Sequence, residues 1–238
     1  TYSGRFEEFA SAQPLPLTDI LINPGDGAMY FTVGGRRVQS ALYRVTYTGK
    51  QSTAPLAAAQ RATEDKRQRQ RRHTLEAHLQ KGASRASGKE LDHIWRSLGA
   101  SDRGIRHAAR AALEKQPLKN WKARLKPEKN PVIAGAALIA LARTDGEASS
   151  ASVIDKVIDF EYGKLKDRQQ RLDLLRALTL SLTRGAMPAP QLRTKLITWL
   201  DSIYPAKSPE ENRDLSTITA FLQAPYAVSK TMSLLENA

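Results

Sequence analysis

The stretch that decides the fold is ELDHIWRSLGASDRGIRHAARAALE, residues 90–114. It contains two runs in which apolar residues recur at i, i+3, i+4 and i+7, the spacing of one face of an α-helix. These positions are Leu91, Ile94, Trp95 and Leu98 in the first run, and Ile105, Ala108, Ala109, Ala112 and Leu113 in the second. Gly99 ends the first run, and Asp102 stands where the N-cap of the second belongs. The stretch therefore predicts two helices joined by a tight turn, the repeating unit of a helical solenoid.

Similar patterns follow downstream. We expect further helices over residues 130–143, 152–160, 166–184, 191–203, 208–223 and 226–236. Asn130-Pro131 and Ser208-Pro209 are start signals, each an N-cap residue followed by proline at the first helical position. Helices of about 10 to 18 residues with short loops predict roughly four stacked antiparallel pairs. The predicted fold is mainly α, a HEAT-like α-solenoid over residues 89–238, with a plain α-helical bundle as the alternative because the repeat period is irregular.

The segment PLTDILINPGDGAMYFTVGGRRVQSALYRVTYT, residues 16–48, follows a β pattern instead. Alternating and β-branched residues predict strands at 19–22, 28–33 and 41–47, with loops at 23–27 and 34–40, and residues 2–9 can add a fourth strand. The parity break between Leu42 and Val45 indicates a bulge or an edge position. So small a sheet, with apolar residues on both faces, is marginal alone. We therefore predict a small antiparallel remnant of a propeller blade over residues 1–50, with its sister blades upstream, and a basic helical linker over 51–88.

Composition limits the classes of function. With 41% hydrophobic and 26% charged residues the chain resembles an ordinary globular protein, and no apolar run is long enough for a membrane span. It has no cysteine, which excludes disulfides, thiolate metal sites and c-type haem attachment within it. It starts at Thr1 without a targeting signal, so we expect a piece of a longer protein.

No catalytic or metal-binding motif is visible. The histidines at 73, 78, 93 and 107 form no HExxH or other paired motif, so no metal site is expected. Gly34-Gly35 lacks the spacing of a nucleotide-binding fingerprint. The three tryptophans fall on apolar stripes and are predicted to be core residues, namely Trp95, Trp121 and Trp199.

The positive charge is concentrated in one part of the chain. The whole chain carries +13, and residues 61–129, with 19 basic and 8 acidic side chains, account for +11 of it. The candidate partner-binding residues are Lys66, Arg67, Arg69, Arg71, Arg72, Arg103, Arg106 and Arg110. Between residues 51 and 129 the only aromatic residues are Trp95 and Trp121, whereas surfaces that bind nucleic acid usually add stacking aromatics. This favours a solvated surface or an acidic protein partner, with nucleic-acid binding as the alternative.

Parts of the chain resemble known families. The pattern in Thr18-Asp19, Gly25–Phe31, Gly35-Arg36 and Leu42–Val45 resembles the closing blade of a sorbosone/glucose-dehydrogenase-like β-propeller. The whole chain is similar to the middle of a family of large bacterial proteins, described as membrane-bound dehydrogenases or PVC-type haem-binding CxxCH proteins. The wider resemblance is carried by residues 101–114, 200–215 and 221–235, and its most distinctive part is YPAKS, residues 204–208.

The resemblance implies a propeller, then HEAT-like repeats, then a c-type cytochrome domain, in an extracytoplasmic or periplasmic protein. This chain is then expected to be a non-catalytic scaffold, partnered by the propeller and cytochrome domains of the parent polypeptide, with no cofactor of its own. Haem c or a quinone would belong to the parent, which the resemblance makes a dehydrogenase. Related propellers hold a quinone near their axis, and of this chain only Arg36 and Arg37 could face one. We interpret them instead as turn residues that bind neighbouring backbone or carboxylate groups.

Overall fold

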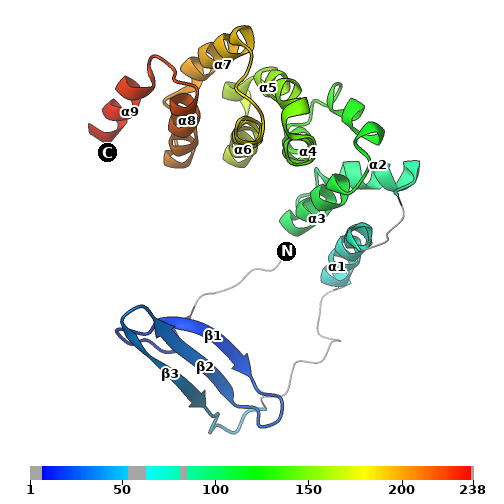
Figure 1. Ribbon diagram of the computed structural model, residues 1–238. Helices are drawn as coiled ribbons and strands as arrows, with labels where there is room; N and C mark the ends of the chain where they lie inside the picture. The colour runs from blue at the N-terminus through cyan, green and yellow to red at the C-terminus, as the bar shows by residue number, and fades with distance from the viewer. Residues whose placement is uncertain (1–6, 53–62, 81–84, 237–238) are drawn as a thin grey trace. The chain divides into compact units, whose positions relative to one another are not determined.

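The structure is a computed structural model that describes residues 7–52, 63–80 and 85–236 (Figure 1). It is mainly helical, with one small antiparallel sheet in the described part. Its contacts divide the chain into a sheet unit before residue 63 and a helical unit from Thr63 onward.

The sheet unit has three described strands, β1 (Leu17–Ile22), β2 (Met29–Gly35) and β3 (Val38–Val45), in the order β1-β2-β3. The predicted edge position of the third strand is confirmed. The predicted loop at 34–40 is wrong, because β2 continues to Gly35 and β3 begins at Val38. The register shifts lie between Leu17 and Asp19 and between Val33 and Gly35, whereas residues 42–45 pair regularly with β2, so the bulge that we expected there as the alternative is not found. Residues 7–9 of the predicted fourth strand have no regular structure, and residues 2–6 lie outside the described residues.

One face of this sheet is almost wholly apolar. Ile20, Phe31 and Tyr43 lie opposite one another in the register and so share a face, where the rings of Phe31 and Tyr43 stack 4.9 Å apart. Every residue of β1 is exposed, and Leu21, on the other face, is 62% exposed. Burial is concentrated on the central strand, where Val33 is buried. Neither face is therefore fully covered by the described residues.

The helical unit holds nine described α-helices, with short 3₁₀ turns between several of them. The helices are α1 (Thr63–Glu76), α2 (Gly88–Ser97), α3 (Arg103–Glu114), α4 (Pro131–Thr144), α5 (Ser150–Ile158), α6 (Arg168–Arg184), α7 (Pro190–Ile203), α8 (Pro209–Phe221) and α9 (Ala227–Glu236). The 3₁₀ turns are η2 (Ala77–Leu79), η3 (Leu118–Asn120), η4 (Lys122–Leu125), η5 (Gly146–Ser149) and η6 (Tyr162–Lys164). Seven of the expected helices, from α3 to α9, agree with the prediction to within about two residues, as does α2.

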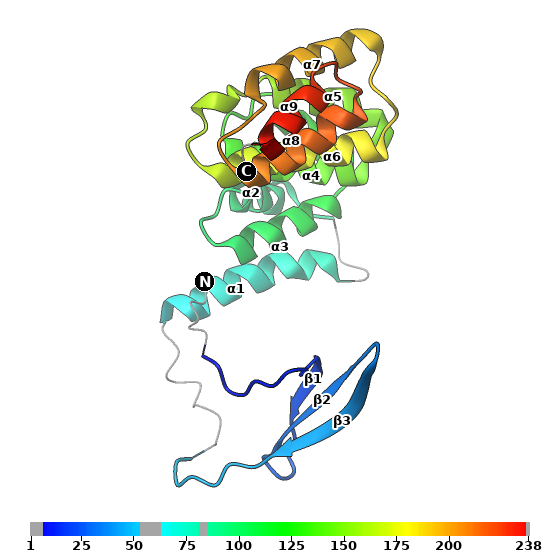
Figure 2. The ribbon, with the colours of Figure 1, turned by 90° about the vertical axis from the view of Figure 1, so that its left-hand side faces the viewer.

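The helices lie in two rows (Figure 1). One row, which we call the inner row, consists of α1, α3, α4, α6 and α8, each in contact with the next. Helices α2, α5 and α7 form the outer row, and the turned view shows α1 beside α3 (Figure 2). Arg143 Nε at the end of α4 pairs with Glu114 of α3 at 3.0 Å, and Arg184 Nη1 of α6 donates to the Arg143 carbonyl at 2.6 Å. Helices α3, α4 and α6 therefore end at the same edge and run parallel.

The core of the helical unit consists of two hydrophobic clusters. The first extends from Leu75 of α1 to α6, and the second from α5 to α8. Trp199 of α7 packs against both clusters. The predicted burial of Trp95 and Trp121 is confirmed, at 8% and 1% exposed. Trp121 lies between η3 and η4 rather than on a regular helix.

The start of α4 offers a first prediction. Asn130 Oδ1 accepts hydrogen bonds from the backbone N–H groups of Val132 and Ile133, at 3.0 and 3.4 Å, ahead of Pro131 at the first helical position. Asn130→Ala removes this cap and is expected to lower the free energy of unfolding by about 1 kcal/mol. Chemical denaturation followed by circular dichroism measures the loss. Lys129→Ala, an exposed neighbour, serves as the control, and equal losses in both variants would contradict the capping role.

Candidate functional site

A groove of about 390 Å³ runs along the exposed side of three inner-row helices, and we call it the α3–α4–α6 groove. One wall is a basic stripe on α3, formed by Arg103, Arg106, His107 and Arg110. These residues recur at i, i+3, i+4 and i+7, so they share a helical face, away from the buried stripe that begins at Ile105. The structure thus brings together the three arginines of α3 that the sequence singled out.

These three arginines differ in how they are held. Arg106 Nη1 donates to the carbonyl oxygens of Ala100 and Ser101, both at 2.8 Å, and so is fixed against the loop before α3. Arg110 pairs with Glu114 and lies 3.3 Å from His107 Nδ1. Arg103 is exposed and has no hydrogen bond or ion pair to any residue that the structure describes. Arg103 therefore offers its guanidinium to an incoming anion.

The floor of the groove is the half-buried stripe Val132, Ala136 and Ile139 of α4, with Arg143 at its end. Helix α4 can lie close to α6 because it carries Gly135 at their contact. A Cβ added at Gly135 would stand 3.2 Å from the Cβ of Asp173. The floor is therefore apolar over about two helical turns and ends in a cation.

The opposite wall comes from α6 and is mixed in charge. Gln169 Nε2 donates to Asp173 Oδ1 at 2.9 Å. Burial raises the pKa of Asp173, while the Gln169 hydrogen bond and the nearby charges of Arg106 and Arg110 act in the opposite direction. Arg176 is exposed and, within the described part of the chain, has neither a hydrogen bond nor an ion pair. The two walls thus each present one unpartnered arginine.

The groove as a whole attracts anions. Five arginines and a single carboxylate, that of Asp173, line it. Glu114 at its end binds both Arg110 and Arg143, which leaves Arg103 and Arg176 as the exposed groove arginines that have no counter-ion among the described residues. Arg143, Arg176 and Asp173 were not predicted, because their relation to α3 depends on which helices share a row. A signal for these three residues is present in the exposed stripes of successive helices, when those stripes are compared with one another.

The basic residues of α1 do not line this groove. Lys66, Arg67, Arg69 and Arg71 are exposed on α1 itself, and Arg72 pairs with Glu76 at 3.1 Å. Leu75 is fully buried, so α1 packs on α3 through one side and leaves its basic side to solvent. The structure therefore brings only part of the predicted basic set to the groove.

Arg36 and Arg37 form the two-residue turn between β2 and β3. Both are exposed, and Arg37 has a φ of 66°, a left-handed conformation that is uncommon outside glycine. Neither makes a hydrogen bond or ion pair with a described residue, so the bonds to backbone or carboxylate groups that we expected are not found there.

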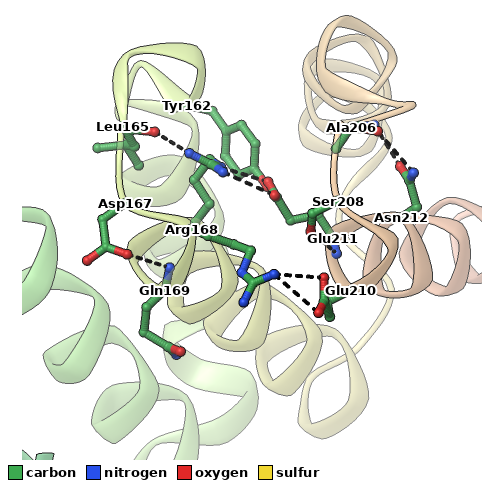
Figure 3. A network of polar contacts seen from close by, with 11 residues as sticks. Tyr162, Leu165, Asp167, Arg168, Gln169, Ala206, Ser208, Glu210, Glu211 and Asn212 are labelled. Carbon is green, nitrogen blue, oxygen red and sulfur yellow. Dashed lines mark hydrogen bonds and ion pairs between the residues drawn. The ribbon is translucent and has the colours of Figure 1, made fainter.

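A second cluster of titratable groups is buried between α6 and α8 (Figure 3). Glu211 of α8 is 1% exposed and accepts from Arg171 Nε at 2.7 Å and Arg171 Nη2 at 3.1 Å. Tyr162 Oη donates to the same carboxylate at 2.8 Å, and Arg171 also donates to the Leu165 carbonyl. The Ser208 Oγ cap accepts from the Glu211 backbone N–H at 3.2 Å.

The Glu211 cluster has a structural role, as a buried ion pair with its hydrogen-bonding groups. Burial raises the pKa of Glu211, but the hydrogen bonds from Arg171 and Tyr162 outweigh it and hold that pKa below its ordinary value. Burial, followed by the Glu211 hydrogen bond, raises the pKa of Tyr162, which keeps its phenol protonated. Since Arg171 binds both carboxylate oxygens and Tyr162 binds one of them, the groups stabilise α6 against α8 rather than face a ligand.

Asp173 gives a second prediction. Its carboxylate is the one negative group lining the groove, so Asp173→Asn is expected to strengthen the binding of labelled polyglutamate by up to about tenfold, where tenfold is about 1.4 kcal/mol. Fluorescence anisotropy at low salt measures the affinity. Asp159→Asn, an exposed site outside the groove, is the control, and an unchanged affinity for Asp173→Asn would show that the probe binds elsewhere.

Comparisons with known proteins do not assign this chain to a family. No family model, curated protein or solved structure matches this chain. Among the described residues, no cluster of three or more histidine and acidic side chains is arranged to hold a metal ion. No helix in the described part has both the length and the apolarity needed to cross a membrane.

Proposed function

We propose that the helical unit is a HEAT-like α-solenoid that serves as a non-catalytic scaffold, and that its α3–α4–α6 groove binds an acidic segment of a partner protein. The two rows of helices, in which each inner-row helix contacts the next, support the solenoid. Such stacks commonly use the open surface of one row for binding.

One observation carries the binding proposal: the groove combines unpartnered arginines on opposite walls with an apolar floor. Arg103 and Arg176 supply the charge, and Val132, Ala136 and Ile139 supply the apolar area. A protein segment offers both carboxylates and apolar side chains, whereas a nucleic-acid backbone offers phosphates alone. Among the described residues no phenylalanine, tyrosine or tryptophan lines the groove, so the large aromatic platform on which unpaired bases usually stack is missing there.

The residues of the groove also support a non-catalytic role. Its histidine, His107, lies against Arg110, and its carboxylate, Asp173, is bonded to Gln169. Among the described residues, neither is paired with a serine or threonine hydroxyl in the manner of a base that activates a hydroxyl nucleophile.

The alternative is a basic HEAT-like module that binds nucleic acid, favoured by the five groove arginines and by the exposed basic side of α1. Titration of the full chain with labelled polyglutamate and with a 20-base-pair DNA duplex, at about 50 and 200 mM salt, separates the two functions. We expect polyglutamate to bind at low salt, and to bind more tightly than the duplex. Tighter duplex binding, with the steep salt dependence of phosphate contacts, would establish the alternative.

We also propose that this chain belongs to a larger exported redox protein, in which the sheet completes a propeller and the parent carries haem c or a quinone. The exposed residues of β1 and the apolar sheet face support this, because a three-stranded sheet needs packing partners. With sugars and dye acceptors, the 238-residue chain is expected to show no turnover. Robust activity would contradict the scaffold role.

A further inference from the structure

The shape of the groove also indicates the secondary structure of the segment that it binds. We infer that it binds an amphipathic acidic α-helix, which lies along α4 with its apolar stripe on Val132, Ala136 and Ile139 and its carboxylates toward Arg103 and Arg176. The inference rests on the proposed function and deepens it, since an acidic segment could also bind as an extended or irregular chain.

The width of the groove favours a helix. Packed helix axes lie about 8–10 Å apart, so α3 and α6, which flank α4, are separated by roughly 16–20 Å. A helix with its side chains is about 10–12 Å across and can contact the floor and both walls together. An extended chain points successive side chains in two opposite directions, so it cannot direct side chains to the floor and to both walls together.

The spacing of the lining residues favours a helix as well. Val132, Ala136 and Ile139 recur at i, i+4 and i+7 on α4, and Arg103, His107 and Arg110 recur in the same way on α3. The stripes run parallel because α3 and α4 end together at the Glu114–Arg143 pair. A partner helix with the same spacing can place an apolar residue on the floor, and an acidic one at each wall, at every turn over about 10 Å.

The small residue at the centre of the floor allows close approach. Ala136 stands at its centre between the larger Val132 and Ile139, so the side chain in the middle of the floor is shorter than those at its ends. A leucine of the partner can enter at Ala136 and contact apolar side chains on both sides. This apolar contact separates the inference from simple attraction between opposite charges, which needs no stripe.

The test uses three labelled peptides of eighteen residues and the full chain, with fluorescence anisotropy at about 50 mM salt. The first peptide carries leucines at i, i+4, i+7 and i+11 with glutamates on both flanks. The second has the same composition with the leucines spread evenly around the helix, and the third is polyglutamate. We expect the first peptide to bind at least about tenfold more tightly than either of the others.

Variants locate the binding. Arg103→Glu with Arg176→Glu is expected to weaken binding of the amphipathic peptide at least about tenfold, because both residues are exposed and unpartnered among the described residues. The matched control, Arg96→Glu with Arg213→Glu, makes the same charge change at exposed sites of α2 and α8, outside the groove, and is expected to change the affinity less than threefold. Helix formation by the bound peptide is measured by circular dichroism difference spectra.

The outcomes distinguish this inference from the proposed function. Equal affinity for all three peptides, lowered in the groove variant, would overturn the helical partner and leave the acidic-partner function standing. No binding of any peptide at low salt would overturn both. Binding of the amphipathic peptide that the groove and control variants weaken equally would place the site elsewhere and also overturn the inference.

Discussion

Replacing Glu211 with alanine is expected to lower the free energy of unfolding of the helical unit by about 3–5 kcal/mol. Glu211 is 1% exposed and receives hydrogen bonds from Arg171 and Tyr162. Its removal leaves the guanidinium of Arg171, itself largely buried, without a counter-ion between α6 and α8. Urea denaturation followed by circular dichroism measures the loss.

The adjacent residue supplies a matched control. Glu210 is paired with Arg168 at 3.2 Å in an exposed position, so Glu210→Ala is expected to lower the free energy of unfolding much less than Glu211→Ala does. Replacing the buried pair together, as Arg171→Met with Glu211→Leu, should cost less than Glu211→Ala, because no unpaired charge is left buried. Equal losses in the Glu210 and Glu211 variants would show that the Glu211 cluster contributes little to the free energy of unfolding.

The same carboxylate makes the free energy of unfolding depend on pH in the acidic range. The pKa of Glu211 lies below its ordinary value of 4.5 in the folded protein, so the folded state binds its proton less readily than the unfolded chain does. Its stabilising effect is therefore fully present above the unfolded pKa and is lost as the pH falls through the lowered folded pKa. In Glu211→Ala, the fall in stability over that acidic range should be shallower than in the unmodified protein.

Trp121→Ala is the second substitution with a large expected effect, a loss of about 3–5 kcal/mol. Trp121 is 1% exposed within the first hydrophobic cluster, and its Nε1 donates to the Gln116 carbonyl at 3.4 Å. Between α3 and α4 the chain forms the short turns η3 and η4, and the Trp121 indole between them is among the largest fully buried side chains. Thermal unfolding followed by circular dichroism measures the change.

Trp121→Phe tests the cause of that loss. Phenylalanine keeps most of the apolar volume and removes the hydrogen bond to Gln116, so it should recover more than half of the loss seen with alanine. A phenylalanine variant as unstable as the alanine variant would mean that the hydrogen bond, rather than packing, holds this part of the core.

The helices were predictable because their signals are local. Apolar stripes such as Ile105 to Leu113, with N-caps at Asp102, Asn130 and Ser208, are complete within a dozen residues of sequence. The turn at Arg36 and Arg37 is predicted from the sequence, but the loop around it, 34–40, is predicted too long, because strand pairing continues to Gly35 and resumes at Val38. The segment around Trp121 was missed because 3₁₀ turns have no long periodic pattern.

The groove could be predicted only in part. The basic stripe of α3 is visible in the sequence, but the contribution of Arg143 and Arg176 depends on α4 and α6 lying side by side. Asp173 has the same dependence, since its position beside Gly135 is a tertiary contact between helices about forty residues apart in sequence. The candidate partner-binding residues of α1 are predicted from charge alone, which does not indicate the direction that a side chain faces.

Trp199 joins the two hydrophobic clusters, and this contact affects how the helical unit unfolds. In a stack whose neighbours interact only locally, either end can melt while the other stays folded. A shared indole, which also meets the Tyr162 ring edge-on at 5.7 Å, couples the two halves, so the loss of one exposes apolar surface of the other. The helical unit should therefore unfold as one cooperative body, and amides in both clusters should exchange with solvent deuterium at similar rates.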